Sequence, residues 1–157
     1  MSGVLCDKSV SVRNKGYIYK TVVRPAMLYG AETWPIKKRQ EDRMNVAEMR
    51  MLRWMCGVTR MDRIRNTRIR GSVKVTEISK KVQERRLQWF GHVERREEAY
   101  VGKRVRRMEV SGKRNRGRPK MRYMDKIKED LKEKNLDCSL AQNRAAWKTE
   151  TRNVDPT

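Results

Sequence analysis

The side chains of this chain that are best suited to a chemical role are the positively charged ones. Arg116-Gly117-Arg118-Pro119 lies within the basic segment KRNRGRPKMR at 113–122. Guanidinium groups donate hydrogen bonds to phosphate oxygens, often two at a time. An Arg-Gly-Arg-Pro core can also lie extended in the narrow minor groove of A·T-rich DNA. Glycine and proline would equally form an ordinary turn here, and the two interpretations are compatible if the turn is exposed.

Residues for bond-making chemistry are sparse by comparison. His92 is the single histidine, and no Ser, Cys or carboxylate pair lies beside it in a nucleophile or metal arrangement. We therefore expect His92 to be structural. Asp125 and Asp130 are five residues apart on an expected helix, so they point to different faces, and the lysines around them indicate solvated ion pairs rather than a metal site.

The three cysteines, Cys6, Cys56 and Cys138, are odd in number and far apart. This spacing fits neither a disulfide framework nor a metal site, so we expect reduced thiols in an intracellular protein. We predict no catalytic residue, no cofactor and no metal in this chain.

Charge composition points to a polyanionic partner. Forty Lys and Arg oppose nineteen Asp and Glu in 157 residues, a formal charge of +21. Such a charge repels itself unless DNA or RNA screens it. Residues 60–122 carry 22 basic and 7 acidic side chains, whereas residues 124–157 carry seven of each. We therefore expect the centre of the chain to bind nucleic acid and the C-terminal helices to be packing or adaptor elements. No segment has the apolar length of a membrane span.

Apolar periodicity predicts a mostly α fold, a small helical domain of about five or six helices with a basic loop. The strongest pattern runs from 36 to 56, where Met and Leu recur at helical spacing before Gly57. Pro25 should break or kink a helical run over 14–29.

Three further helices follow from capping and periodicity. Asp62 is expected to cap a short basic helix ending at Gly71. Thr76 is expected to cap a helix whose apolar face precedes Gly91 and which continues to about residue 96. We expect the last two helices over 123–136 and 140–147.

Two segments are less regular. Weak alternation over 99–112 leaves a short hairpin open. The tail is expected to be loose. We divide the chain into a helical region at 1–98, a basic loop or hairpin linker at 99–123, a helical pair at 124–150 and a tail at 151–157.

Arginines in the expected helices are free to meet phosphate, whereas Trp54 and Trp89 sit within apolar periodicity and are assigned to the core rather than to base stacking. The residues that we predict to contact nucleic acid are Arg60, Arg63, Arg65, Arg68, Arg70, Arg85, Arg86, Arg95, Arg96, Lys113, Arg114, Arg116, Gly117, Arg118, Pro119 and Lys120.

Four segments in order carry a resemblance to a known family: VVRPAMLYGAETWPI at 22–36, MLRWMCGVTRMDRIRN at 51–66, RRLQWFGHVERR at 85–96 and RGRPKMRYMD at 116–125. Together they resemble the C-terminal part of a non-LTR (LINE-type) retrotransposon reverse transcriptase, over roughly residues 9–147. Tyr123 stands where the family pattern usually has Trp, and this conservative change keeps an aromatic anchor at the position.

The resemblance implies a thumb and following segment that grip a template–primer duplex, RNA, DNA or an RNA–DNA hybrid, beside a fingers-and-palm polymerase chain. The paired metal-binding aspartates of the family's palm motif are missing here, so this chain alone is not expected to act as an RNA-directed DNA polymerase. The basic clusters KRVRR and GKRNRGRPK would suit nuclear import.

Two alternatives remain open. The core at 116–119 resembles an AT-hook, which would make the chain a minor-groove DNA-binding nuclear protein. The chain would otherwise be a translated transposon relic without a selected role.

Overall fold

The structure is a computed structural model that describes residues 2–108, 116–117 and 121–156. Within these ranges the secondary structure is helical and contains no strand, so the predicted mostly α fold is confirmed. The chain forms two compact units. Unit 1 comprises Met1–Tyr29, Ile36–Val82 and Asn153–Thr157, and unit 2 comprises Gly30–Pro35 and Gln83–Arg152.

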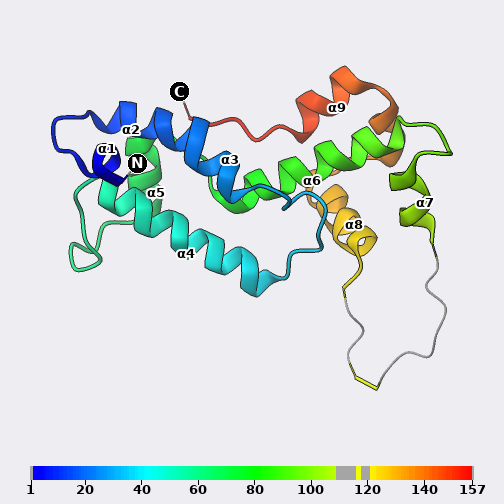
Figure 1. Ribbon diagram of the computed structural model, residues 1–157, viewed down its shortest axis with the longest axis horizontal. Coiled ribbons are helices and arrows are strands. Elements are labelled where there is room, and N and C mark those ends of the chain that lie inside the picture. Colours follow the sequence, from blue (N-terminus) through cyan, green and yellow to red (C-terminus); the bar gives the residue numbers. More distant parts are fainter. Residues whose placement is uncertain (1, 109–115, 118–120, 157) are drawn as a thin grey trace. The chain divides into compact units, whose positions relative to one another are not determined.

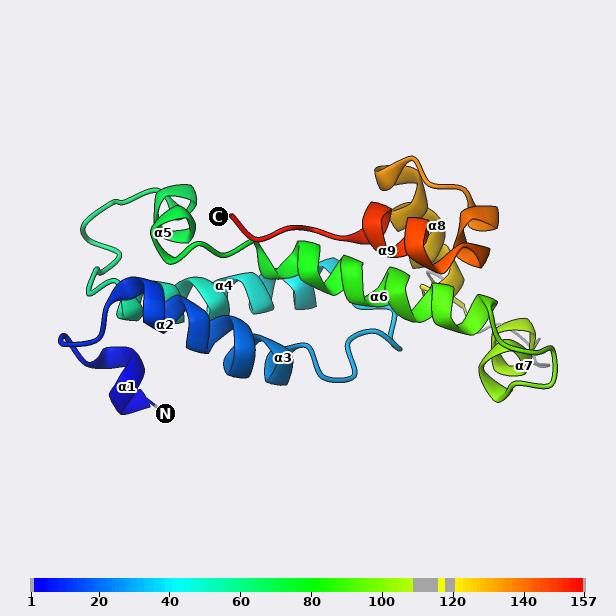
Figure 2. The same cartoon turned by 90° about the horizontal axis from the view of Figure 1, so that it is seen from above.

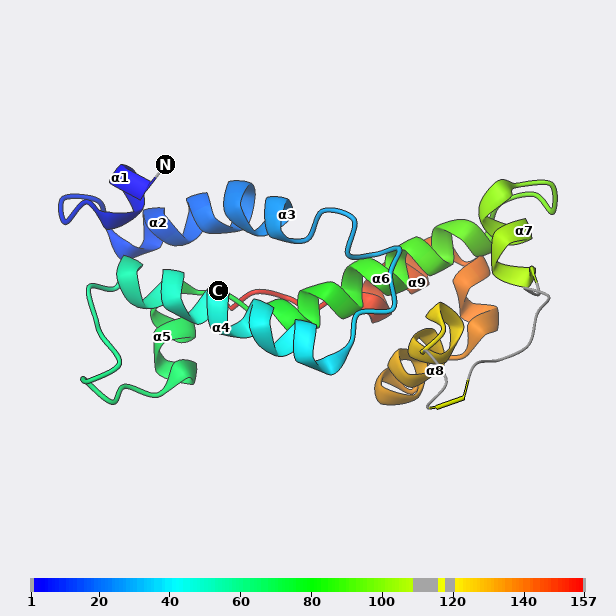
Figure 3. The ribbon, with the colours of Figure 1, turned by 60° about the horizontal axis from the view of Figure 1, so that its bottom comes forward.

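Unit 1 is a cluster of short helices around one long helix (Figure 1). Its elements are α1 (Ser2–Cys6), α2 (Val12–Ile18), the π-helical turn η1 (Tyr19–Val23), α3 (Arg24–Met27), α4 (Lys38–Met55), α5 (Asn66–Val73) and the first turns of α6 (Ile78–Glu94). The run from α2 to α3 lies alongside α4 (Figure 3), and α5 packs against both α2 and α4.

The long helix α4 confirms the prediction made for residues 36–56. Its buried stripe includes Met49, Leu52 and Met55, which pack with Ile69 of α5 in the core of unit 1. Gly57 follows the helix with φ +66°, the left-handed conformation that glycine adopts freely and that ends a helix.

The helical run over 12–27 is interrupted as the proline predicts. The π-helical turn η1 directly precedes α3, in which Pro25 occupies the first turn, where a missing N–H costs little. Tyr19 in η1 is fully buried, so the wider turn also carries a core aromatic.

A buried carboxylate, Glu48 of α4, connects three segments of unit 1. It is 0% exposed. The Tyr19 hydroxyl donates to its Oε1 at 2.9 Å, and the Arg70 guanidinium donates to Oε2 at 2.9 and 3.2 Å. The backbone N–H of Ile78 donates to Oε2 at 3.3 Å. Burial, followed by the charge of Glu48, raises the pKa of Tyr19 well above its usual value, so the phenol stays a donor.

The C-terminal tail is anchored in unit 1, in contrast to the expected loose end. Asp155 accepts two hydrogen bonds from the Arg24 guanidinium, at 2.7 and 2.6 Å. The backbone N–H of Thr76 donates to the same carboxylate at 2.8 Å, and the Asn153 amide donates to the Lys80 carbonyl at 2.7 Å. Bidentate pairing of this kind adds geometric specificity to charge attraction.

We expect the free energy of unfolding of unit 1 to fall below about pH 4 because of Asp155. Burial alone would raise its pKa, but the hydrogen bonds from Arg24 and Thr76 and the nearby positive charges outweigh it and lower the pKa to about 2. The stabilisation is therefore complete above about pH 4, the ordinary range of an aspartate, and is lost as the pH falls toward 2.

After allowance for solvent screening of a partly exposed pair, the loss should be on the order of 1–2 kcal/mol. Urea unfolding at steps from pH 5 to pH 2 measures it. The Asp155→Asn variant should have a shallower slope over this range, and a slope equal to that of the unsubstituted chain would contradict the assignment.

Two predicted helix starts are wrong, because the proposed caps bind elsewhere. Asp62 accepts from the backbone N–H of Thr59 at 2.6 Å, and α5 begins at Asn66. The Thr76 hydroxyl donates to the Val154 carbonyl at 2.8 Å. The predicted end at Gly71 is also wrong, since α5 continues to Val73.

Unit 2 is built on the remaining turns of α6 (Figure 2). Its other elements are α7 (Val101–Arg107), α8 (Tyr123–Lys134), the 3₁₀ turn η2 (Cys138–Gln142) and α9 (Arg144–Thr151). The core joins α6 to α8, η2 and α9 through Leu87, Phe90, Ile127, Leu131 and Trp147.

Gly91 lies in the interior of α6, where it allows another helix to approach closely. A Cβ atom at Gly91 would lie 2.3 Å from Nε1 and 2.6 Å from Cδ1 of Trp147. The missing side chain therefore lets the indole of α9 rest on α6, where Trp147 Nε1 donates to the Leu87 carbonyl at 2.9 Å. Tertiary packing rather than helix termination explains this glycine.

An ion pair joins α6 to α8 inside unit 2. Arg86 donates from Nε to Asp130 Oδ2 at 2.5 Å and from Nη2 to Oδ1 at 3.0 Å. The two side chains are 1% and 2% exposed. Asp130 is therefore buried in a bidentate pair, and the expectation of a solvated ion pair at this position is wrong.

Residues 101–107 form helix α7, so no hairpin is present in the described part of 99–112. Ion pairs hold this helix: Arg106 pairs with Glu94, Lys103 with Glu98 at 3.1 Å, and Arg107 also with Glu98. The weak alternation of valines left a strand open, but this segment is a helix held by ion pairs and not a strand with one apolar face.

Candidate nucleic-acid interface

Four of the predicted contact arginines surround the connection between α4 and α5 in unit 1. Arg60, Arg63, Arg65 and Arg68 are all exposed. The backbone at Arg63 has φ 51°, a conformation that residues with a side chain rarely adopt. The structure thus presents four guanidinium groups over nine positions of the chain.

The connection is held from within by Arg53 and Asp62. Arg53 donates to the carbonyls of Thr59 and Ile64 at 3.1 and 3.2 Å and to the side chain of Asn66 at 2.8 Å. Asp62 accepts from the N–H and the hydroxyl of Thr59 at 2.6 and 2.9 Å. These bonds fix the course of residues 57–65, which we call the arginine loop.

Two predicted contact residues point inward instead. The Arg86 guanidinium is buried against Asp130, and the Arg70 guanidinium bonds to the buried Glu48. Both guanidinium groups stabilise the interior of their units. We therefore leave Arg70 and Arg86 out of the interface proposed below.

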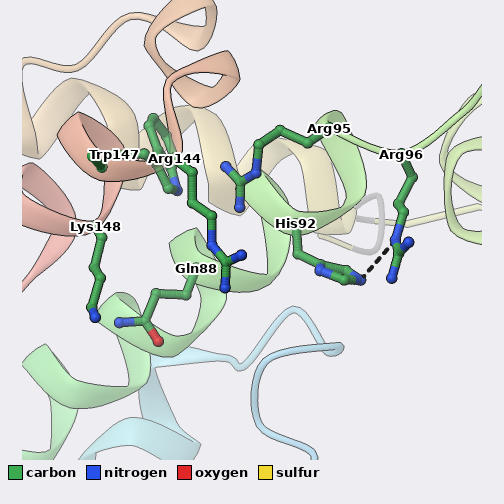
Figure 4. A pocket seen from close by; sticks show the side chains of 8 residues that line it. Gln88, His92, Arg95, Arg96, Arg144, Trp147 and Lys148 are labelled. Atoms are coloured by element: carbon green, nitrogen blue, oxygen red, sulfur yellow. Dashed lines mark hydrogen bonds between the residues drawn. The ribbon is translucent and has the colours of Figure 1, made fainter.

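A basic groove lies between α6 and α9 in unit 2. It measures about 910 Å³ and is lined by Gln88, His92, Arg95, Arg96, Arg144, Ala145, Trp147 and Lys148. Among the residues that the structure describes, no acidic side chain lines it. Figure 4 shows Arg144 of α9 approaching Arg95 of α6 beside His92, with Arg96 beyond the imidazole. Because the groove holds four cations without a carboxylate, it is suited to an anion.

Packing positions the two sides of this groove. The indole of Trp147, seated on Gly91, fixes α9 against α6. Arg95 Nη1 donates to the Ala141 carbonyl of η2 at 2.6 Å, which orients its guanidinium along the groove wall. Arg96 Nε donates to His92 Nε2 at 3.4 Å, and this bond requires a neutral imidazole nitrogen as acceptor.

The cations of the groove repel one another. The pKa of His92 is lowered from its usual value by desolvation and then by the charges of Arg96, Arg95 and Arg144. Desolvation and the charge of Arg144 likewise lower the pKa of Arg95. A bound phosphate would offset this repulsion and raise both pKa values, so the clustered cations of the groove favour anion binding.

The remaining predicted contacts are spread over other places. Arg85 is exposed on α6, and Arg95 and Arg96 line the groove. Arg116 and Gly117 are exposed, and Gly117 has φ +124°. The other residues of the basic loop, Lys113, Arg114, Arg118, Pro119 and Lys120, lie outside the described residues, so the AT-hook interpretation stays a prediction.

Sequence reasoning missed the α9 side of the groove. Arg144 and Lys148 come from the charge-balanced C-terminal segment that was assigned to packing. Their spacing of four residues places both on one face of a helix, and that spacing was a signal that could have found them.

Comparisons with known proteins point to a mobile genetic element. The chain is similar to an uncharacterized protein of Caenorhabditis elegans described as transposon-derived, with 25% identity over 155 residues. The match covers 91% of this chain and 54% of that protein, so the chain spans about half the length of the relative. No family model matches, and no solved structure matches. The likeness supports a transposon origin.

Among the described helices, none is long and apolar enough to cross a membrane.

Proposed function

We propose that the chain is the nucleic-acid-binding part of a non-LTR retrotransposon reverse transcriptase and grips a template–primer duplex through its phosphates. The observation that carries the proposal is the groove of unit 2, where Arg95, Arg96, Arg144 and Lys148 converge and no acidic side chain of the described residues lines the groove. Polymerisation itself is assigned to the fingers and palm, which the four resembling segments do not include.

Three further facts support this proposal. The net charge of +21 favours a polyanion. The likeness to a transposon-derived protein agrees with the resemblance of the four segments to a retrotransposon enzyme. Phosphate contacts from arginine and lysine provide affinity that does not depend on sequence, as a polymerase that travels along its template requires. As part of the same proposal, we expect this chain to act in the nucleus.

Removal of the α9 cations tests the groove. The double variant Arg144→Gln/Lys148→Gln should bind an RNA–DNA hybrid more weakly, and the slope of log affinity against log salt should fall by about one for each lost phosphate contact. Fluorescence anisotropy with labelled duplexes at several salt concentrations measures both quantities. Both residues are exposed, so the fold should survive.

The matched control is Lys128→Gln/Lys132→Gln, which removes two exposed cations from α8 of the same unit. It changes the net charge equally but leaves the groove intact. If both double variants lower affinity and slope by the same amount, general charge rather than the groove accounts for binding.

Four ligands separate the alternatives: an A·T-rich duplex, a G·C-rich duplex, an RNA hairpin and an RNA–DNA hybrid. Similar affinities with steep salt dependence and a modest preference for the hybrid support the polymerase proposal. A preference for the A·T-rich duplex of about tenfold, or 1.4 kcal/mol, favours the AT-hook alternative. No measurable binding to any of the four favours the relic.

A further inference from the structure

Trp54 of α4 is one of the most exposed large side chains in unit 1. Its side chain is 69% exposed, although apolar periodicity assigns it to the core. Leu52, two positions earlier, is 0% exposed. Two residues turn a helix by about 200°, so the buried stripe that holds Leu52 directs Trp54 to the opposite face. The prediction that Trp54 packs in the core is wrong.

The exposed face that carries Trp54 is basic. Arg43, Val46 and Arg50 precede it at spacings of three and four residues, and all are exposed. The positive charge of this face and the net charge of +21 make a polyanion its complementary partner. An aromatic ring between cations is typical of surfaces that bind unpaired nucleic acid.

The arginine loop begins directly beside this tryptophan. Gly57 N–H donates to the Trp54 carbonyl at 3.0 Å, so the chain turns away at once and leaves the indole uncovered. Figure 1 shows the loop leaving the end of α4 and returning to α5. Arg60 is exposed within it, and the bonds from Arg53 hold the loop in one course. The backbone that carries Arg60 is thus held in its course before a ligand arrives, which lowers the cost of binding.

We propose that Trp54 is a stacking platform for an unpaired base, with Arg43, Arg50 and Arg60 contacting the phosphates on either side. The proposal rests on the nucleic-acid binding proposed above and adds the class of ligand: a single strand, or the single-stranded template beyond a primer duplex. Any base can stack on the indole, because every base presents a π-face. Discrimination is therefore between paired and unpaired strands rather than between sequences.

Replacement of Trp54 tests this proposal in the full chain. The probe is a single strand of about 12 nucleotides, within the range bound by known single-strand modules, that contains the fluorescent base 2-aminopurine. Binding of the unsubstituted chain should quench the probe by stacking. Trp54→Ala should weaken single-strand binding about tenfold and leave a blunt duplex of the same length within about twofold. The salt slope should stay the same, since no phosphate contact is removed.

Two variants control the experiment. Trp54→Phe keeps an aromatic face and should retain most of the affinity and the quenching. Trp34→Ala removes a tryptophan that is 66% exposed in unit 2, within a segment, 30–35, that has no Lys or Arg. It should change neither quantity. Because Trp54 is exposed, its removal should leave the melting curve unchanged.

The outcomes separate this inference from the proposed function. If the chain binds duplex with steep salt dependence but Trp54→Ala behaves like Trp34→Ala on the single strand, the stacking proposal alone fails. The stacking proposal also fails if the chain binds the single strand without quenching the fluorescence of 2-aminopurine. If the unsubstituted chain binds no nucleic acid, both proposals fall.

Discussion

Asp130→Ala should destabilise unit 2 by about 3–5 kcal/mol, because it leaves the Arg86 guanidinium buried without its carboxylate. In a chain of this size such a loss corresponds to a fall in the melting midpoint of roughly 10 °C or more. Amide hydrogen exchange would locate the loss: protection should fall in α6 after Gln83 and in α8 and α9, while unit 1 keeps its protection.

Glu129→Ala is the matched control for this prediction. It removes the same charge from the neighbouring position of α8, where Glu129 is exposed and pairs with Lys126 at 3.1 Å across three residues. Its cost should stay below about 1 kcal/mol. The double replacement Arg86→Met/Asp130→Leu should recover much of the stability, since a buried apolar pair needs no desolvated charge. Equal effects of Asp130→Ala and Glu129→Ala would contradict the buried pair.

Glu48→Ala should have an effect of similar size in unit 1, about 3–5 kcal/mol. It removes the acceptor of the Tyr19 hydroxyl, the Arg70 guanidinium and the Ile78 N–H at once. It also leaves a cavity beside Leu52 in the core. Urea unfolding followed by circular dichroism measures the loss.

Asp42→Ala provides the comparison, because Asp42 is an exposed acid of the same helix that pairs with Lys38 at 3.5 Å. Its cost should be a few tenths of a kcal/mol. The loss of stability in Glu48→Gln should lie between those of Glu48→Ala and Asp42→Ala. The amide oxygen can still accept a hydrogen bond, but the negative charge that pairs with Arg70 is lost. A Glu48→Ala variant as stable as Asp42→Ala would show that the carboxylate does not connect the three segments.

The helices with strong apolar periodicity were predictable from the sequence, and those fixed by charge were not. Helix α4 was predicted because its Met and Leu residues recur at helical spacing over five turns. Helix α7 was not, because ion pairs with Glu94 and Glu98 hold it rather than an apolar stripe. The packing role of Gly91 was not predictable, since nothing in its neighbourhood in the sequence indicates that Trp147 will lie on it.

The same limit applies to the candidate interface. The sequence predicts many surface arginines, yet it cannot separate Arg86 from Arg85, because burial depends on Asp130, 44 positions away. It predicts Arg95 and Arg96 but not the opposite wall of the groove, which comes from α9. The exposure of Trp54 was within reach, because the helical phase that buries Leu52 turns Trp54 outward.

The segments that resemble a retrotransposon enzyme also have direct structural roles. Arg24 of the first segment binds Asp155, and Gly91 of the third seats Trp147. Tyr123 of the fourth packs at the core of unit 2 and donates to the Arg86 carbonyl at 3.5 Å. Several residues that make these segments recognisable therefore stabilise the two units, and they are not the cations proposed to bind nucleic acid.

The pairing of Arg24 with Asp155 gives unit 1 an order of assembly. The two residues are 131 positions apart, and all of unit 2, residues 30–35 included, lies between them in the chain. Unit 1 can therefore close only after the whole of unit 2 has been synthesised. An interruption of the gene between the codons of residues 152 and 155 would leave all of unit 2 encoded while Arg24 of unit 1 lacked its carboxylate partner.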